Sequence, residues 1–365
     1  MQILHLADRL TDRGGAYTWM LGVVEGLSGA HEQRLVVGED PGEARARCSV
    51  VVCPGLESRV ARAVPLDDLV ADFRPDVIHV HNVVNPFVLE WAATRQGALV
   101  TVQDHRFFCP TRGKWTLAGE VCRRPMSREV CASCFEDAAY FEEVLALTER
   151  RLAAVRRLPV SVISRYMREE LVAAGVPATS VHVVPPFVHG LDPNAAADGP
   201  ACVLFVGRLV EAKGVREAVK AWRRSGVDLP LVLAGTGPLR AELEAQAAAE
   251  KVGPALEVLG WVERGRLSAL YQRARAVLFP SRWQEPFGIV GIEALSFGVP
   301  VVGWESGGVG EWHPGPGLVR WGDTGALARA LTKAVGRRLL LLPRFDRDES
   351  IGRLTALYAR IRTGN

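Results

Sequence analysis

Two glutamates bracket an apolar segment in the second half of the sequence. In "EPFGIVGIE", seven residues separate Glu285 from Glu293, and a Pro-Phe-Gly corner leads into an apolar run. The segment follows the apolar run "AVLFP" and continues into "ALSFG", so we expect a strand, a turn and a helix that begins at Gly288. On such a helix Glu293 lies roughly 7.5 Å beyond the start.

This arrangement suits an extended polar ligand. A carboxylate only accepts hydrogen bonds, so each glutamate can bind a pair of ligand hydroxyls, and the free N–H groups of a helix start attract negative charge. A sugar at one end, a ribose at the other and phosphate between them would fit. The alternative for any single glutamate is a solvated acid on a loop or helix.

Two cations follow an earlier predicted strand. In "FVGRLVEAKG", Arg208 and Lys213 lie five residues apart, between a strand exit and another helix. A guanidinium fork and an ammonium point charge at a strand exit can together neutralise the oxygens of one diphosphate. Taken alone, an Arg and a Lys at this spacing are most often a surface pair.

The pattern of strands and helices expected around these residues indicates an α/β fold. Short β-branched or apolar runs alternate with amphipathic stretches in both halves, which indicates two parallel sheets covered by helices. The Pro-, Gly- and Ala-rich segment 185–201 reads as a linker. We therefore expect one domain over residues 1–190 and a second over 200–345, with a last helical segment at 346–365 that packs back on the first domain.

Composition excludes several classes of protein. With 44 Lys+Arg against 41 Asp+Glu, the net charge of +3 gives no field that would favour nucleic acid. No apolar run reaches about 18 residues, and charge at Asp8 and Arg9 interrupts the opening stretch, so the sequence predicts a cytoplasmic protein. Peripheral membrane association stays open, and the oligomeric state is not indicated.

Four of the seven cysteines fall within one short stretch. Cys109, Cys122, Cys131 and Cys134 are separated by 12, 8 and 2 residues and end in a Cys-x-x-Cys pair. In a reducing compartment four thiolates favour a metal over disulfides, either structural zinc or a [4Fe-4S] cluster. Four reduced cysteines without a ligand are the alternative. We expect a metal here to order this segment as a lid over the ligand-binding edge of the sheet.

At this point the second half resembles the retaining glycosyltransferases of family 4, which have the GT-B fold of two Rossmann-like domains facing across a cleft. The matching pieces are the Arg208 and Lys213 segment, "LAGTGPLR", "LGWV", the paired glutamates and "EALSFGVPVVGWESGGVGE", in the family's order. The resemblance implies a nucleoside-diphosphate sugar donor and an acceptor hydroxyl, with no divalent cation needed for catalysis. It assigns the diphosphate to Arg208 and Lys213, the donor sugar to Glu285, the ribose to Glu293, and main-chain N–H contacts to Phe287, Gly288, Ile289 and Val290.

The first half resembles the family more loosely. Gly14 and Gly15 follow the first predicted strand, where the family places a Gly-Gly loop beside the donor, although a plain turn that needs positive φ explains them as well. Relatives carry His where this chain has Gln103. Asp104 and His105 are the nearest candidates for catalytic groups near the acceptor, and a strand-end acid and a solvated imidazole are the alternative.

The segment "DVIHVHN" contributes further polar residues to the same predicted strand edge. We expect His81 and Asn82 to face the rim where ligands bind, and His79 to pack in the core.

Two other functions compete with a glycosyltransferase acting in polysaccharide, envelope-glycan or metabolite-glycoside synthesis. A GT-B epimerase or phosphorylase is one, although epimerases lack this pairing of motifs and phosphorylases need a pyridoxal lysine in a much longer chain. A non-catalytic subunit that binds nucleotide or metal is the other, and the substituted Gln103 keeps it open.

Overall fold

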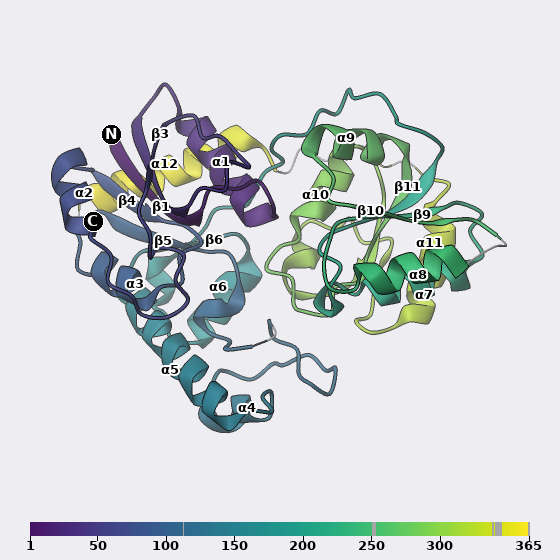
Figure 1. The fold of residues 1–365 in the computed structure, drawn as a ribbon, viewed down its shortest axis with the longest axis horizontal. Helices are drawn as coiled ribbons and strands as arrows, with labels where there is room; N and C mark the ends of the chain where they lie inside the picture. The colour runs from purple at the N-terminus through teal and green to yellow at the C-terminus, as the bar shows by residue number, and fades with distance from the viewer. Residues whose placement is uncertain (112, 250–252, 338, 340–344, 364–365) are drawn as a thin grey trace. The chain divides into compact units, whose positions relative to one another are not determined.

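The computed structural model describes residues 1–111, 113–249, 253–337, 339 and 345–363. The chain divides into two compact units, Met1–His189 with Asp346–Asn365, and Gly190–Phe345. Each unit contains one parallel sheet with helices around it (Figure 1).

The first unit is built on a seven-stranded sheet with the order β3-β2-β1-β4-β5-β6-β7. Every adjacent pair of these strands is parallel. The order reverses between β1 and β4, which is where doubly wound sheets bind ligands. The strands are β1 (Gln2–Arg9), β2 (Glu32–Glu39), β3 (Ser49–Val52), β4 (Val77–Val80), β5 (Ala98–Val102), β6 (Val160–Val162) and β7 (Val181–Val183).

Helices pack around this sheet, except that α4 packs against α5, and one helix returns from the end of the chain (Figure 1). They are α1 (Gly15–Leu27), α2 (Leu66–Phe73), α3 (Pro86–Ala92), α4 (Arg128–Ala132), α5 (Ala138–Val155), α6 (Arg165–Ala173) and α12 (Arg347–Thr363). The last of these packs against α1 and β4. Its buried Tyr358 hydroxyl lies 2.7 Å from Nδ1 of His79, which ties the C-terminal helix to the sheet. Residues 364 and 365 of the predicted segment lie outside the described part of the chain.

The second unit contains a six-stranded parallel sheet with the order β10-β9-β8-β11-β12-β13. Its strands are β8 (Cys202–Val206), β9 (Leu231–Ala234), β10 (Leu256–Gly260), β11 (Ala274–Phe279), β12 (Val301–Trp304) and β13 (Leu318–Val319). Its helices are α7 (Val215–Ser225), α8 (Arg240–Ala249), α9 (Arg264–Arg273), α10 (Ile289–Ser296) and α11 (Thr324–Ala334).

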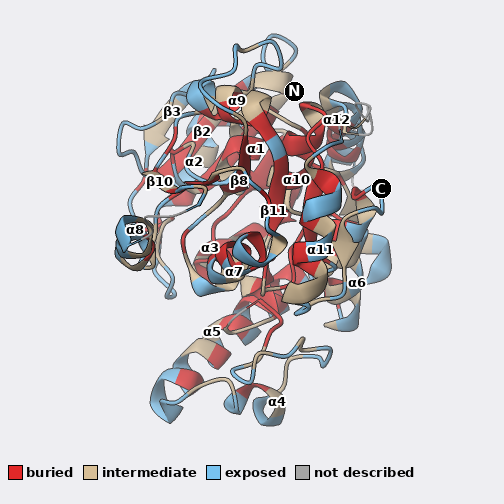
Figure 2. Cartoon of the chain, turned by 90° about the vertical axis from the view of Figure 1, so that its right-hand side faces the viewer, coloured by how far each residue is buried: buried red, intermediate tan, exposed pale blue. Residues whose placement is uncertain are grey.

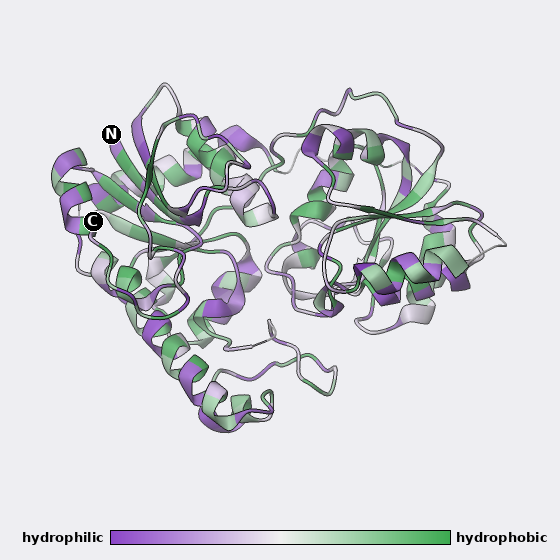
Figure 3. Cartoon of the chain, viewed as in Figure 1, coloured by the Kyte–Doolittle hydropathy of each residue, from purple (hydrophilic) through white to green (hydrophobic). Residues whose placement is uncertain are grey.

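The central strands consist mainly of apolar residues because they are buried. The described side chains of β4, β5 and β9 are all buried, because helices cover both faces of a parallel sheet. Figure 2 shows the buried residues, in red, gathered in the interior, and exposed residues on outer helices such as α8. Helices such as α7 alternate apolar and charged positions along their length (Figure 3). The predicted α/β fold class is confirmed. Among the described residues, no helix has the length and apolar character needed to cross a membrane.

Candidate donor and acceptor sites

The predicted donor-binding residues gather around the topological switch point of the second sheet. The strand order reverses between the neighbours β8 and β11. Arg208 follows β8 directly, and the loop that carries Glu285 follows β11. Because parallel strands end at the same edge of a sheet, the two loops project from adjacent points of that edge.

Lys213 and Glu285 form a buried ion pair. The ammonium Nζ donates to Glu285 Oε1 at 2.7 Å, and the two side chains are 19% and 4% exposed. Ser281 also donates its hydroxyl proton to Glu285 Oε1. Lys213 Nζ lies 4.4 Å from the centre of the Trp283 ring, so a cation–π contact holds the ammonium from another side.

This site carries more positive than negative charge. Burial lowers the pKa of Lys213 despite the opposing Glu285 carboxylate, and the Arg208 guanidinium lowers it further. Among the described residues, no acidic side chain pairs with Arg208. Two cations and one carboxylate at a strand edge leave a charge that a bound anion can neutralise.

The start of α10 presents its N–H groups at the same loop. The helix begins at Ile289 with Gly288 as its N-cap, within one residue of the predicted start. Gly288 has a φ of 92°, which favours glycine. Trp312 donates its indole N–H to the carbonyl of Phe287 at 2.5 Å, and its ring lies against Gly291, where an added Cβ would come within 1.9 Å of it. The loop is therefore fixed by packing before any ligand binds.

Glu293 is held by two side chains from α9. Arg264 donates to Oε1 at 2.7 Å and Tyr271 donates its hydroxyl to Oε2 at 2.9 Å. Glu293 is 3% exposed, so the alternative of a solvated helix acid is wrong. The carboxylate keeps further lone pairs, and its orientation is set by the Arg264 and Tyr271 contacts.

Sequence reasoning missed the residues that orient the two glutamates. Arg264, Tyr271, Ser281, Trp283 and Trp312 all contact the predicted site residues or their loop. The proximity of Ser281 and Trp283 to Glu285 in the sequence was an available signal. For the other three, nothing in their local pattern distinguishes them from ordinary core or surface residues.

In the first unit, Gly14 caps α1. Its φ is 128°, and its carbonyl accepts hydrogen bonds from the N–H groups of Tyr17 and Thr18. The turn therefore requires glycine at this position, as the plain-turn alternative supposed. A donor contact by Gly14 and Gly15 stays a prediction.

Asp104 and His105 both have structural partners. Asp104 accepts a hydrogen bond from the N–H of Arg106 at 2.9 Å and forms an ion pair with its Nε at 2.7 Å. His105 is buried, and its Nε2 lies 2.9 Å from the Tyr166 hydroxyl. His105 is therefore not the solvated imidazole of the alternative, and the catalytic role of either residue stays a prediction.

Two buried side-chain amides lie near the switch point of the first sheet. Asn82 follows β4 and Gln103 follows β5, and the two strands are neighbours. Asn82 Nδ2 and Gln103 Nε2 are buried and have no hydrogen-bond partner among the described residues. An unpaired buried N–H group costs about 1 to 3 kcal/mol, so these groups are suited to donate to a ligand or water.

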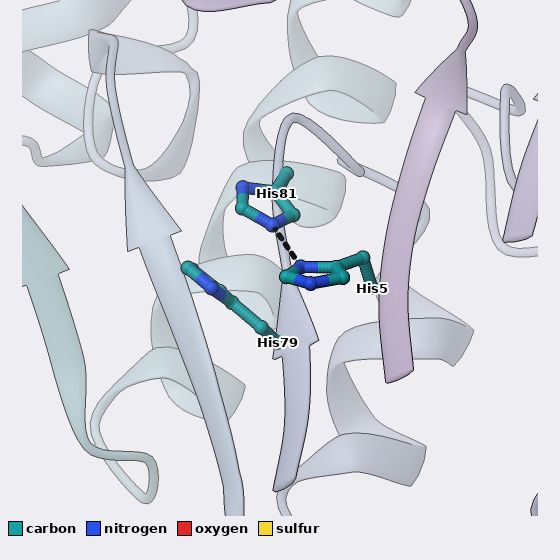
Figure 4. A group of neighbouring side chains, drawn as sticks. All are labelled: His5, His79 and His81. Carbon is teal, nitrogen blue, oxygen red and sulfur yellow. Dashed lines mark hydrogen bonds between the residues drawn. The ribbon is translucent and has the colours of Figure 1, made fainter. Parts of the chain in front are cut away.

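A cluster of three histidines lies beneath this edge. His5, His79 and His81 are fully buried (Figure 4). One ring nitrogen of each histidine lies within 4.8 Å of a ring nitrogen of each of the other two. His81 does not face the rim as predicted but turns inward, with Nε2 3.0 Å from Nδ1 of His5. His79 packs in the core as expected.

Hydrogen bonds account for most of the nitrogens in this cluster. His5 Nε2 lies 3.0 Å from Gln33 Oε1, and His79 lies between the hydroxyls of Tyr358 and Thr101. The Gln33 oxygen can only accept, so His5 donates from Nε2 and accepts from His81 at Nδ1. Three neutral imidazoles account for this network, except that Nδ1 of His81 has no hydrogen-bond partner among the described residues.

Acidification should destabilise the first unit through these histidines. Burial lowers the pKa of His5 to about 4 and lowers the pKa of His79 and His81 well below the usual value of 6.5. The unfolded chain then binds more protons than the folded chain below about pH 6.5, so stability falls as the pH drops from there towards 4. We expect a loss of about 1.4 kcal/mol per pH unit for each histidine.

Urea unfolding at pH 7 and pH 5, followed by hydrogen exchange in peptides from β1 and β4, measures this loss. His31→Gln is the comparison variant. Burial also lowers the pKa of the partly buried His31, so its removal should change the slope by less than one of the three fully buried histidines contributes. Equal stability of the β1 and β4 peptides at both pH values would contradict the expectation.

The four clustered cysteines come together in the loop that follows β5 and in α4. Burial, with a smaller contribution from the neighbouring thiols of Cys109, Cys134 and Cys122, raises the pKa of Cys131 to about 11. The N–H of Cys134 bonds to the Cys131 carbonyl at 2.9 Å. Among the described residues, the histidine cluster is the only group of three or more potential ligands with atoms within 4.8 Å, so the sulfurs are neighbours without metal-binding geometry.

Comparison with known proteins matches both halves of the chain. Residues 14–186 match the family model "Glycosyl transferase 4-like domain", and residues 191–314 match "Glycosyl transferases group 1". Each half is thus similar to a glycosyltransferase domain. The structure of Anabaena HepE in complex with UDP and glucose superposes with a TM-score of 0.71 and 17% identity, over 98% of this chain and 99% of that one. The chain thus has the GT-B fold.

Curated relatives align over parts of this GT-B chain. Glycogen synthase of Mycobacterium tuberculosis is 40% identical over 116 residues, which is 31% of this chain and 28% of that protein. A GDP-mannose-dependent phosphatidylinositol monomannoside mannosyltransferase of Mycolicibacterium smegmatis is 30% identical over 248 residues, 60% of this chain and 63% of that protein. The aligned part is thus less than two thirds of either relative.

Proposed function

We propose that the chain is a retaining glycosyltransferase of family 4 that moves a sugar from a nucleoside-diphosphate sugar to an acceptor hydroxyl. The observation that carries the proposal is the buried Lys213–Glu285 pair beside Arg208 and the start of α10. The family matches of both halves support glycosyl transfer as the reaction.

The excess positive charge suits the departing diphosphate. In the proposed reaction the acceptor oxygen bonds to the anomeric carbon while the bond from that carbon to the diphosphate breaks, and the hydroxyl proton passes to the leaving phosphate. Arg208, Lys213 and the N–H groups of Ile289 and Val290 stabilise the charge that develops there. Glu285 and Trp283 already hold Lys213, and Trp312 holds the loop before α10, so these groups need little reorganisation during the reaction.

The two glutamates then bind the polar ends of the donor. Glu285 accepts hydroxyls of the transferred sugar, and Glu293, oriented by Arg264 and Tyr271, accepts the ribose hydroxyls. We propose that the main-chain N–H groups of Phe287 and Gly288 complete the contacts to sugar and phosphate. No protein nucleophile and no divalent cation are required in this scheme.

We propose that the acceptor binds at the carboxyl edge of the first sheet. Gln103 stands where relatives carry a histidine, and its buried Nε2 donor, with that of Asn82, can bind a sugar or acceptor oxygen. Asp104 and His105 are proposed to position the acceptor through this loop. A glycan or small-molecule acceptor is compatible with these donors.

Donor binding and turnover test the proposal together. Thermal-shift measurements with UDP-, GDP- and dTDP-sugars should show one nucleotide that raises the unfolding temperature, since binding to the folded chain stabilises it by mass action. Release of nucleoside diphosphate with a panel of acceptors should follow. A chain that binds donor but never releases nucleoside diphosphate would support a non-catalytic subunit and contradict the transferase.

We further propose that Cys109, Cys122, Cys131 and Cys134 hold a structural zinc ion or a [4Fe-4S] cluster. Four thiols from one loop and α4 match the donor set of either group, and their sulfurs would have to move closer together than the structure places them to bind it. Burial and the neighbouring thiols of Cys109 and Cys122 raise the pKa of Cys131 and Cys134, and a bound cation would reverse this effect by stabilising the thiolates. The metal would order the loop as an acceptor lid.

Elemental analysis and the visible absorption spectrum should find one metal site per chain. Cys131→Ser and Cys134→Ser should each lose the metal, because a four-thiolate site needs all its ligands. Cys48→Ser, which changes a thiol outside the cluster, is the matched control. A colourless, metal-free and fully active protein would contradict the proposal.

A further inference from the structure

A basic cavity lies at the amino-terminal edge of the first sheet, at the opposite end of the strands from the rim where Asn82 and Gln103 lie. It has a volume of about 280 Å³. Leu158 and Pro159 precede β6, and Thr179 and Ser180 precede β7, so the cavity opens where these two strands begin. Nothing in the proposed transfer reaction uses this end of the sheet.

Arginine side chains from separate segments converge on this cavity. Arg156 and Arg157 follow α5, and Arg360 comes from α12. No carboxylate is among the described residues that line the cavity. Arg156 donates to the carbonyl of Ala174 at 2.6 Å, whereas Arg157 and Arg360 form no ion pair with any described residue.

The cavity combines this charge with hydroxyl donors and an apolar floor. Thr179 and Ser180 supply the hydroxyls, and Leu158 and Leu357 are buried beneath. His182 lines the same cavity, and burial lowers its pKa while Arg360 and Arg168 lower it further. The arginines therefore place positive charge beside the His182 imidazole.

We propose that this cavity is a second, anion-binding site that takes a phosphate group through the guanidinium forks of Arg157 and Arg360. Guanidinium groups bind phosphate oxygens in pairs, and the hydroxyls of Thr179 and Ser180 can add further donors. The phosphate can belong to a soluble phosphorylated molecule or to the headgroup of an anionic phospholipid, and the same two arginines would bind either.

The site can be tested in full-length protein carrying Lys213→Ala, which weakens the clamp proposed for the donor diphosphate. Inorganic pyrophosphate is titrated by calorimetry, and flotation is measured with phosphatidylcholine vesicles with and without phosphatidylglycerol. The variants are Arg157→Ala/Arg360→Ala, the charge-retaining Arg157→Lys/Arg360→Lys, and the control Lys220→Ala/Arg224→Ala. The control removes two cations from a basic groove between α7 and α8.

We expect the double alanine variant to bind at least one probe ten or more times more weakly than the parent. The double lysine variant should also bind that probe more weakly than the parent. The control variant should bind like the parent. Loss of pyrophosphate binding alone identifies a soluble phosphate, and loss of phosphatidylglycerol-dependent flotation identifies a headgroup. The proposal is overturned if neither probe binds, if the control loses as much binding, or if the lysine variant binds like the parent.

Discussion

Lys213→Ala should lower the rate of sugar transfer about 10³-fold, because it removes a charge that stabilises the departing diphosphate. The ammonium lies in a site with excess positive charge and contacts the Glu285 carboxylate directly. Arg208→Ala should cost a similar factor. The measurement is nucleoside diphosphate release at saturating donor and acceptor, with circular dichroism to show that the fold is intact.

Removing Lys213 alone leaves Glu285 buried beside Ser281 without its cation, so part of the loss could come from lower stability. The double variant Lys213→Gln/Glu285→Gln removes both charges and separates the two effects. Lys220→Ala on α7 is a control for the loss of a nearby cation outside the site. Full activity of Lys213→Ala or Arg208→Ala would refute the assignment of the diphosphate clamp.

Gly214→Ala should destabilise the second unit by about 3 kcal/mol or more. Gly214 has a φ of 68°, and an added Cβ would lie 1.8 Å from the carbonyl oxygen of Pro280. That contact is with backbone, so no side-chain rotation can relieve it. Because Gly214 follows Lys213 and caps α7, the shift should also weaken donor binding.

Gly226 at the other end of α7 provides the matched control. Its φ is 65°, and an added Cβ would meet nothing within 4 Å. Gly226→Ala should therefore cost only the backbone strain, about 1 to 2 kcal/mol. Urea unfolding of the two variants should differ clearly, and equal losses would contradict the steric explanation.

The sequence predicted the fold because its local patterns agree with the tertiary structure. The runs that form β1, β4 and β5 are mainly apolar, as strands buried on both faces usually are, and His5, His79 and Thr101 are the buried polar exceptions. The reversals of strand order were not predictable in this way. They depend on pairings such as that between β8 and β11, which lie more than sixty residues apart, and no local pattern records them.

The candidate site was predictable where chain neighbours carry the chemistry. Glu285, Gly288 and Glu293 lie on one loop and one helix, so their spacing was informative. The side chains that orient them come from other elements, as with Arg264 on Glu293. His81 was predicted wrongly because it follows the strand end, where alternation no longer fixes direction, and its hydrogen bond to His5 turns it inward.

The packing of α12 on the first unit affects the order in which the two units can finish folding during synthesis. Residues 190–345 emerge from the ribosome before Tyr358, whose hydroxyl meets His79 in the interior of the first unit. The second unit can thus close its core while the first still lacks a helix. The first unit, although most of it is synthesised first, therefore completes its packing last. Until α12 packs against it, chaperones can bind its exposed apolar surface.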